Sequence, residues 1–263
     1  MTFLEAIILG LVQGLTEFLP VSSSGHLAIG KELLGIETSN LSFEIAVHAA
    51  TVLSTIVAFR KDILSLLTSS LKLKYNKETS YVLKIALSMV PVLIVGLFFK
   101  ERVEAIFGSG LLIVGICLLL TSSLLALSQF VKARENEIKY SNAFLIGIAQ
   151  AFAVLPGLSR SGATISTGLL LGVKREEIAK FSFLMVLVPI LGESFLELIS
   201  GGFSLGESGI NPYSLFAGFT AAFISGLFAC KVMITLVKRA RLTGFAIYCA
   251  VIGLLSIAYS VFY

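Results

Sequence analysis

The chain has 263 residues, of which 56% are hydrophobic and only 14% are charged, and its formal net charge is +4. A soluble domain of this length cannot bury so much apolar surface, so we expect an all-α polytopic membrane protein. The basic excess is typical of loops that face anionic lipid, and no basic cluster interleaved with aromatic residues indicates a nucleic-acid partner.

The first apolar region, residues 2–36, is interrupted by polar residues in the stretch QGLTEFLPVSSSGHL. Pro20, three serines and Gly25 break the run at its centre. This pattern predicts two short helices with a polar break between them, which is typical of a re-entrant hairpin that enters the membrane and returns to the same side. Residues 141–173 have the same character, because Pro156, Gly157 and the sequence SRSG interrupt them.

Six other segments are apolar enough to cross the hydrocarbon core, which takes about 20 residues. Three follow the first hairpin and three follow the second, at about 43–59, 80–99, 110–131, 178–200, 213–237 and 243–262. The chain then forms a single membrane domain with two halves, residues 1–140 and 141–263. The three cysteines, Cys117, Cys230 and Cys249, lie in apolar runs without metal-binding spacing, which predicts small buried side chains.

The loop charges predict the orientation of these segments. Lys and Arg gather in loops 60–78, 132–139 and 238–241, which we expect on the cytoplasmic side. Loop 201–212 has neither residue and loop 100–109 is charge-balanced, so both can lie outside. The sides alternate without conflict only if each hairpin returns to the side that it entered from. The first hairpin then opens to the outside, the second opens to the cytoplasm, and both termini lie outside.

The two broken regions are internal repeats of each other. With a shift of 137 residues, Gly10–Ile36 aligns with Gly147–Val173 without a gap and with eight identities in 27 pairs. Chance alone gives about two or three in a chain of this composition. The identical pairs are Gly10–Gly147, Gln13–Gln150, Ser22–Ser159, Ser24–Ser161, Gly25–Gly162, Leu33–Leu170, Leu34–Leu171 and Gly35–Gly172. Because three spans follow each copy, the halves are expected to be inverted, as in many transporters.

The differences between the two copies indicate where the chemistry lies. Glu17, Ser23 and His26 stand where the second copy has Val154, Arg160 and Ala163. One hairpin therefore supplies a carboxylate, a hydroxyl and an imidazole, and the other supplies a guanidinium. If the two tips meet, these groups form one pocket. Gln13 and Glu17 are four residues apart and share a helix face, whereas Ser22, Ser24, Ser159 and Ser161 can serve as helix caps.

Arg160 is costly at a hairpin tip inside an apolar segment, and this cost is justified where an anion must be held by two hydrogen bonds. Helix N-termini at both tips add backbone N–H donors, so we expect a phosphate or diphosphate site. Other intramembrane polar residues, Glu44, His48, Glu193, Glu197 and Lys231, are expected mainly to pair between spans. His48 is a weaker catalytic candidate than His26, because neither a serine run nor a glycine break surrounds it. The residues themselves leave hydrolysis and transport both open.

The sequence resembles the undecaprenyl-diphosphate phosphatases, also called bacitracin-resistance proteins. The family's first motif corresponds to Gln13–Glu17 in QGLTE, where many members carry glutamate in place of Gln13. Its second motif corresponds in full to PGLSRSGAT, from Pro156 to Thr164, and PVSSSGH also fits. The likeness covers the whole chain. It implies an integral membrane enzyme that hydrolyses undecaprenyl diphosphate to the monophosphate, recycles the lipid carrier for peptidoglycan and other wall polymers, and gives bacitracin resistance.

The resemblance implies a hypothesis for the mechanism. Ser23 attacks the terminal phosphorus, His26 acts as general acid or base, Glu17 orients His26, and Arg160 stabilises the phosphoryl oxygens. An alternative makes His26 the nucleophile. The expected substrate-binding residues are Gln13, Ser22, Ser24, Gly157, Ser159, Ser161 and Thr164.

The expected cofactor is a divalent cation, Mg²⁺ or Ca²⁺, that shields the diphosphate, with Glu17 as its candidate ligand, and no organic cofactor is expected. The expected partners are the polyprenyl diphosphate substrate and membrane lipid, and a homodimer stays among the alternatives. The implied location is the cytoplasmic membrane of bacteria, with the active site facing outward. The competing hypothesis is a transporter or flippase of the polyprenyl phosphate carrier.

Overall fold

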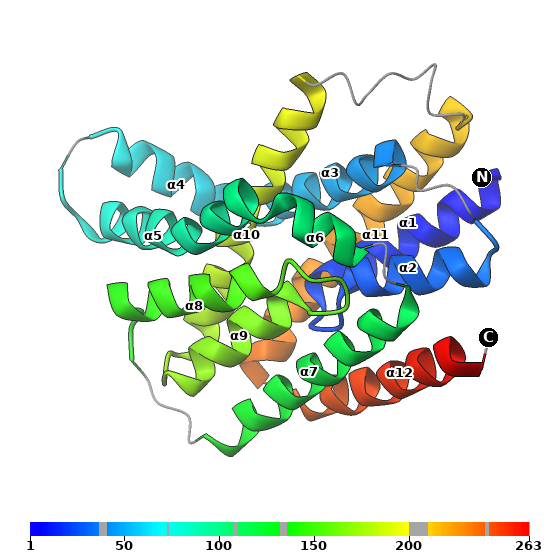
Figure 1. The fold of residues 1–263 in the computed structure, drawn as a ribbon. Coiled ribbons are helices and arrows are strands. Elements are labelled where there is room, and N and C mark those ends of the chain that lie inside the picture. The colour runs from blue at the N-terminus through cyan, green and yellow to red at the C-terminus, as the bar shows by residue number, and fades with distance from the viewer. Residues whose placement is uncertain are drawn as a thin grey trace.

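The computed structural model describes residues 1–36, 41–72, 74–107, 110–131, 136–199, 210–239 and 242–262. This part of the chain consists of α-helices and their connections, as the composition predicts (Figure 1). The helices are α1 (Phe3–Phe18), α2 (Ser23–Leu33), α3 (Leu41–Ala58), α4 (Arg60–Ser70), α5 (Lys77–Phe98), α6 (Lys100–Phe107), α7 (Leu111–Phe130), α8 (Tyr140–Phe152), α9 (Arg160–Leu170), α10 (Arg175–Ile199), α11 (Pro212–Arg239) and α12 (Thr243–Phe262).

Several of these helices can cross a membrane. By length and apolar composition, α5, α7, α11 and α12 qualify within the described residues, and α3 with α4 forms a fifth candidate that is bent by 77°. The expected span 178–200 coincides with α10. The side chains of α10 from residue 193 onward, including Glu193 and Glu197, lie outside the described part. The expected outer loop 201–212 and the basic residues at 132–135 and 240–241 also lie largely outside it.

Two segments that we expected to be loops contain helices. Residues 60–78 include α4, and residues 100–109 include α6. Both segments are rich in charged residues, and neither helix is long enough to be a membrane span by itself. Neither helix contains glycine or proline, and Asp62 and Glu101 lie in the first turns, where acidic side chains favour a helix. Charge density marks the end of a membrane span but does not mark the end of helical structure.

Each of the two repeated regions forms a pair of helices around a polar break, as the sequence predicts. The first break separates α1 from α2 and the second separates α8 from α9. Ser22 and Ser159 cap the second helix of each pair, accepting hydrogen bonds from the backbone N–H of Gly25 at 3.3 Å and of Gly162 at 3.0 Å. The equivalence of the two copies therefore extends from sequence to local structure.

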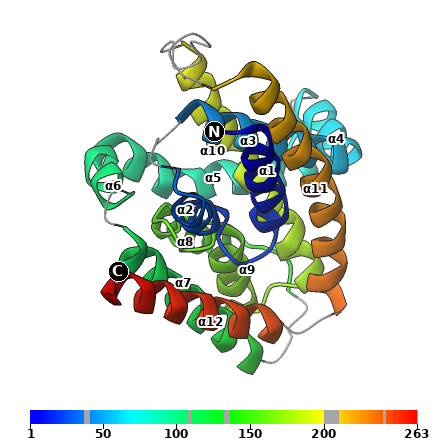
Figure 2. The same ribbon diagram turned by 90° about the vertical axis from the view of Figure 1, so that its right-hand side faces the viewer.

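Helix packing crosses between the two halves of the chain. Helix α1 packs on α11, and α8 packs on α5. A Cβ atom on Gly10 would lie 2.3 Å from the carbonyl oxygen of Gly218, and one on Gly147 would lie 2.3 Å from that of Ser88. These repeat-equivalent glycines thus let each hairpin approach the backbone of the opposite half. Helices α7 and α12, which lie side by side in Figure 2, also approach each other closely through Gly115.

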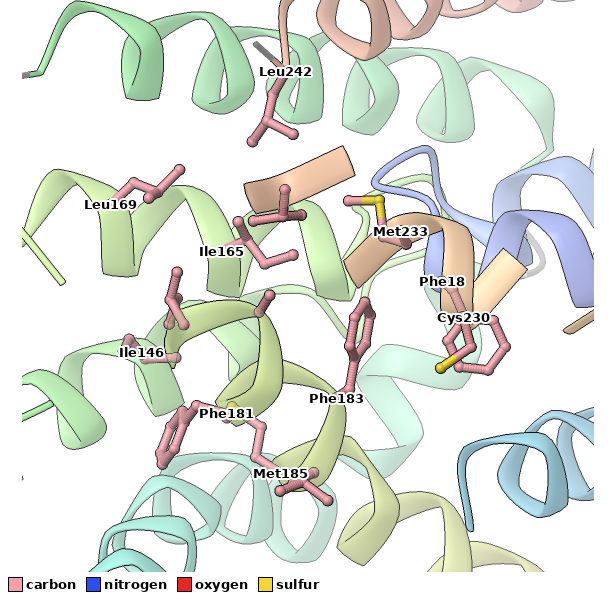
Figure 3. Packing of buried hydrophobic residues seen from close by; sticks show 14 of the residues in the cluster. Phe18, Ile146, Ile165, Leu169, Phe181, Phe183, Met185, Cys230, Met233 and Leu242 are labelled. Atoms are coloured by element: carbon pink, nitrogen blue, oxygen red, sulfur yellow. The ribbon is translucent and has the colours of Figure 1, made fainter. Parts of the chain in front are cut away.

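A buried apolar cluster lies beside the two breaks. Figure 3 shows Phe18, Phe183, Cys230 and Met233 within it, from α1, α10 and α11. The rings of Phe18 and Phe183 meet edge to face with centroids 5.9 Å apart. The expectation for the cysteines is confirmed, because all three are buried and free of disulfide bonds. Phe18, which follows Glu17, and Phe183, which follows Ser182, are therefore buried in the same apolar cluster.

Candidate active site at the two helix breaks

Glu17 is the point at which the two breaks meet. Its carboxylate is only 5% exposed, and its Oε1 accepts a hydrogen bond from Nη2 of Arg160 at 2.6 Å. Its Oε2 accepts from Ser23 Oγ at 2.5 Å and from Gln13 Nε2 at 2.9 Å. A buried carboxylate is stable only when it is paired and hydrogen-bonded, and here the second hairpin supplies the countercharge. Glu17 and Ser23 of the first hairpin are therefore neighbours of Arg160, which lies far from them in the sequence.

The serines at the two tips are arranged as equivalent pairs. Ser22 and Ser24 have their Oγ atoms 3.3 Å apart, and so have Ser159 and Ser161. Ser161 also donates to the carbonyl oxygen of Leu19 at 3.1 Å, so one tip is hydrogen-bonded to the other. Ser22 differs from Ser159 in its backbone, because its φ is +69°. A serine in that region carries strain of the kind that gathers at functional sites.

His26 occupies a different environment from the one expected. Its Nδ1 donates to the carbonyl oxygen of Ser22 at 2.8 Å, and its Nε2 lies 2.8 Å from the hydroxyl of Tyr248 on α12. The two rings are nearly parallel, with centroids 5.6 Å apart. Ser23 donates to Glu17 directly, so the expected order Ser23–His26–Glu17 is not the hydrogen-bonding order here. The first turn of α2 turns His26 toward α12, and the sequence offered no signal that would identify Tyr248.

His48 approaches Glu17 instead. Its Nε2 lies 3.9 Å from Oε2 of Glu17, and its Nδ1 donates to the carbonyl oxygen of Glu44 at 2.8 Å. Sequence reasoning ranked this histidine below His26 because no helix break surrounds it. Proximity to a break in the sequence does not predict this contact, because α3 passes beside the first hairpin after the chain has turned.

Gly157 and Thr164 have supporting positions. Gly157 has a φ of +92°, and a Cβ atom there would lie 2.4 Å from the carbonyl oxygen of Val114. Thr164 is 1% exposed and donates to the carbonyl oxygen of Arg160, with Ser182 Oγ 2.6 Å away. Thr121 of α7, which the sequence did not single out, accepts from the N–H of Ser159 at 3.0 Å. These residues contact the second tip and connect it to α7 and α10.

Two cavities border the pair of Glu17 and Arg160. The first, of about 230 Å³ including its open mouth, is lined mainly by polar residues of the tips: Thr16, Glu17, Ser22, Ser23, Ser24, Ala153, Leu158, Ser159 and Arg160. The second, of about 330 Å³ on the same basis, is more apolar and lies beside α3 and α10: Glu17, Phe18, Thr51, Val52, Thr55, Arg160, Ser161, Ser182, Phe183, Val186 and Ile190. The site thus has a polar side and a largely apolar side.

The described residues contain no group of three or more His, Cys, Asp and Glu that could hold a metal by themselves. Glu17 supplies one carboxylate, and Oε1 of the fully buried Gln13 has no hydrogen-bond partner within the described part of the chain. Mg²⁺ is commonly held by one or two carboxylates together with substrate phosphates. These two oxygen donors fit a cation that arrives with its substrate.

Comparison with known proteins places the chain. Residues 6–255 match the family model described as bacitracin resistance protein BacA. The chain belongs to this family. It is 57% identical to an undecaprenyl-diphosphatase of Bacteroides fragilis, with 99% of both chains covered, and 56% identical to one of Parabacteroides distasonis, with 98% of both covered. An undecaprenyl-diphosphatase of Korarchaeum cryptofilum is 40% identical over 97% of this chain and 98% of its own.

Proposed function

We propose that the protein is a membrane-embedded phosphatase that hydrolyses undecaprenyl diphosphate to undecaprenyl phosphate and inorganic phosphate. Membership of the BacA family and high identity to named undecaprenyl-diphosphatases over nearly the whole chain support the substrate. The observation that carries the site is the Glu17 carboxylate, which accepts a hydrogen bond from Ser23 and pairs with Arg160. The activity returns the lipid carrier to cell-wall synthesis and explains the family's link with bacitracin.

The reaction starts from the hydrogen bond between Ser23 and Glu17. Ser23 Oγ attacks the terminal phosphorus, its proton passes to Oε2 of Glu17, and the bond between that phosphorus and the bridging oxygen breaks. The leaving group is undecaprenyl phosphate. Water then attacks the phosphorus of the phosphoserine, and the bond between that phosphorus and Ser23 Oγ breaks. Glu17 returns its proton to Ser23 Oγ, and a proton of the water replaces the one that the leaving phosphate takes, so that inorganic phosphate is released and the Ser23 hydroxyl is restored. In this scheme Glu17 is the base, a role that the hydrogen bond at 2.5 Å favours over His26.

Arg160 and the helix N-termini bind the anion. Arg160 leaves Glu17 and places its guanidinium on the phosphoryl oxygens, where negative charge increases in the transition state. The N-termini of α2 and α9 begin at the two tips and add backbone N–H donors. A divalent cation held by Glu17, Gln13 and the substrate's phosphates would neutralise charge on the diphosphate.

His26 and Tyr248 form the second functional pair. Their hydrogen bond places a hydroxyl and an imidazole on the face of α2 one turn beyond Ser23. We assign to this pair the proton that the leaving phosphate oxygen requires. The alternative with His26 as nucleophile predicts an acid-labile phosphohistidine, whereas the Ser23 mechanism predicts an acid-stable phosphoserine.

The proposed membrane arrangement follows the loop charges and the repeat. Six spans and two re-entrant hairpins form two inverted halves, 1–140 and 141–263, in the cytoplasmic membrane, with the site open to the outer face. Two observations support this arrangement. Ser22 and Ser159 cap equivalent helices of the two halves, and each hairpin packs on a helix of the opposite half, α1 on α11 and α8 on α5.

Phosphate release from undecaprenyl diphosphate by the purified protein in detergent tests the proposal. We expect release by the unchanged protein, and a loss of at least about 10²-fold in kcat in Ser23→Ala and Arg160→Ala, as for the removal of other transition-state contacts. The surface change Arg102→Ala on α6 serves as the control and keeps full activity. If the unchanged protein releases no phosphate but moves the lipid carrier across liposomes, the transporter hypothesis replaces this one.

A further inference from the structure

His48 faces the same carboxylate oxygen that receives the hydrogen bond from Ser23. Gln13 and Ser23 donate to Oε2 of Glu17, and Nε2 of His48 lies 3.9 Å from that atom. The other oxygen, Oε1, has Arg160 as its described partner. When Arg160 turns to the substrate, Oε1 loses this partner, and the carboxylate needs another group to keep its orientation.

The backbone of α3 fixes which nitrogen of His48 faces Glu17. Nδ1 lies 2.8 Å from the carbonyl oxygen of Glu44, and because a carbonyl oxygen can only accept, Nδ1 carries a proton. Nε2 is then the atom that is left for the carboxylate, and it can donate to this acceptor because both ring nitrogens carry a proton in the imidazolium form. Across 3.9 Å no hydrogen bond is formed, but a small rotation of either side chain brings the two atoms to bonding distance.

Charged and polar groups of several helices surround His48 next to the Glu17 site. The charged groups around it are Glu17 from α1, Arg160 from α9, Glu44 from its own helix and Lys31 from α2. Lys31 forms an ion pair with Glu44, one turn before His48, and so ties α2 to α3. Thr51 and Thr55 follow His48 on the same helix face and line the cavity that Glu17 and Arg160 border.

We propose that His48 is a positioning residue that holds Oε2 of Glu17 toward Ser23 once Arg160 has moved to the phosphoryl group. In the unliganded site Arg160 anchors the carboxylate and His48 stands nearby. In the substrate complex Nε2–H of the doubly protonated His48 ring donates a hydrogen bond to Oε2 and keeps Glu17 in place as the base for Ser23. This inference rests on the proposed phosphatase function.

Two amide variants of His48 distinguish the contribution of Nε2 from that of Nδ1. In His48→Gln the side-chain amide nitrogen can reach the position of Nε2, whereas in His48→Asn it can replace only Nδ1. We expect His48→Ala and His48→Asn to lower kcat for undecaprenyl diphosphate about tenfold with KM changed less than twofold, which corresponds to a barrier increase of about 1.4 kcal/mol. His48→Gln is expected to stay within about threefold of the unchanged protein. If His48→Asn has the same kcat as His48→Gln, or if His48→Gln loses as much kcat as His48→Ala, the proposal is overturned.

A second measurement does not depend on activity. The chain has only two histidines, so ¹⁵N-histidine labelling gives two imidazole spectra, and His26→Gln assigns them. We expect Glu17→Gln to shift the Nε2 resonance of His48, because the carboxylate faces that atom. An unchanged His48 resonance contradicts the contact. A shifted resonance in a protein that releases no phosphate would instead show that the contact is real and that the proposed function is wrong.

Discussion

Ser22 and Ser159 occupy equivalent positions of the repeat and have the same capping role, but they differ in backbone conformation. Ser22 has a φ of +69°, and Ser159 has a φ of −68°. Positive φ is costly for a residue with a Cβ atom and free of strain for glycine. The first tip therefore stores strain next to Ser23 that the second tip lacks.

This difference predicts that replacement of the two cap serines by glycine has effects of different size. Ser22→Ala loses the cap and should lower the free energy of unfolding by about 1 kcal/mol, whereas Ser22→Gly should cost less, because a Gly cap costs only a few tenths and the strain of about 1 kcal/mol is relieved. At Ser159 no strain is relieved, so Gly should exceed Ala there only by the difference between the two cap costs, and the Gly-minus-Ala difference should be about 1 kcal/mol larger at position 22 than at position 159. Chemical unfolding in detergent measures the four variants. Equal Gly-minus-Ala differences at the two positions would contradict the argument.

Much of the residue-scale site was predictable, because unlike residues at equivalent positions of a repeat reveal specialised roles. Glu17, Ser23 and Arg160 stand out in this way, and the structure brings them together. The contacts of the two histidines were not predictable from the pattern. The rotation of α2 carries His26 to Tyr248, and the return of α3 brings His48 toward Glu17, and both depend on tertiary packing.

Helix contacts in this fold depend on glycines at repeat-equivalent positions. A Cβ atom on Gly147 would lie 2.3 Å from the carbonyl oxygen of Ser88, which belongs to the backbone and cannot move aside. Gly96, on α5, has no atom within 4 Å of its Cβ position. The two glycines therefore differ in packing although both are helical.

Alanine should separate these two glycines clearly. Gly147→Ala is expected to destabilise the protein by about 1–3 kcal/mol through overpacking and to reduce phosphatase activity, because α8 positions the second tip. Gly96→Ala should leave activity unchanged and stabilise the protein by about 0.5–1 kcal/mol, as alanine does in a helix interior. Thermal unfolding in detergent measures both. Tolerance of Gly147→Ala would contradict the close approach of α8 and α5.

At the element scale, hydropathy predicted the long apolar helices and the breaks, since both follow from local composition. It missed α4 and α6, because their many charged residues led us to expect loops there. The 77° bend between α3 and α4 occurs at Phe59, and neither proline nor glycine at this position predicts it. Bends of this kind depend on what the two segments pack against, which a single-sequence pattern does not contain.

At the scale of the whole molecule, the proposed topology places both termini outside and the region around α4 in the cytoplasm. The three native cysteines are buried, so they should stay silent toward a membrane-impermeant maleimide in intact cells. A cysteine at Tyr213, which is 79% exposed near the start of α11, should react from outside. A cysteine at Lys74 should react only after the membrane is opened. Labelling of both positions from the same side would contradict the inverted arrangement.

The central claim is that two distant helix breaks form one phosphatase site around Glu17. The most direct test compares phosphate release from undecaprenyl diphosphate by the unchanged protein and by Glu17→Gln, purified in the same detergent. Glutamine keeps the size of the side chain but removes the charge that pairs with Arg160 and the base that receives the Ser23 proton. We predict that Glu17→Gln remains folded and loses at least about 10²-fold in kcat, the lower range for general acid–base catalysis. A folded Glu17→Gln protein with unchanged kcat would contradict the account.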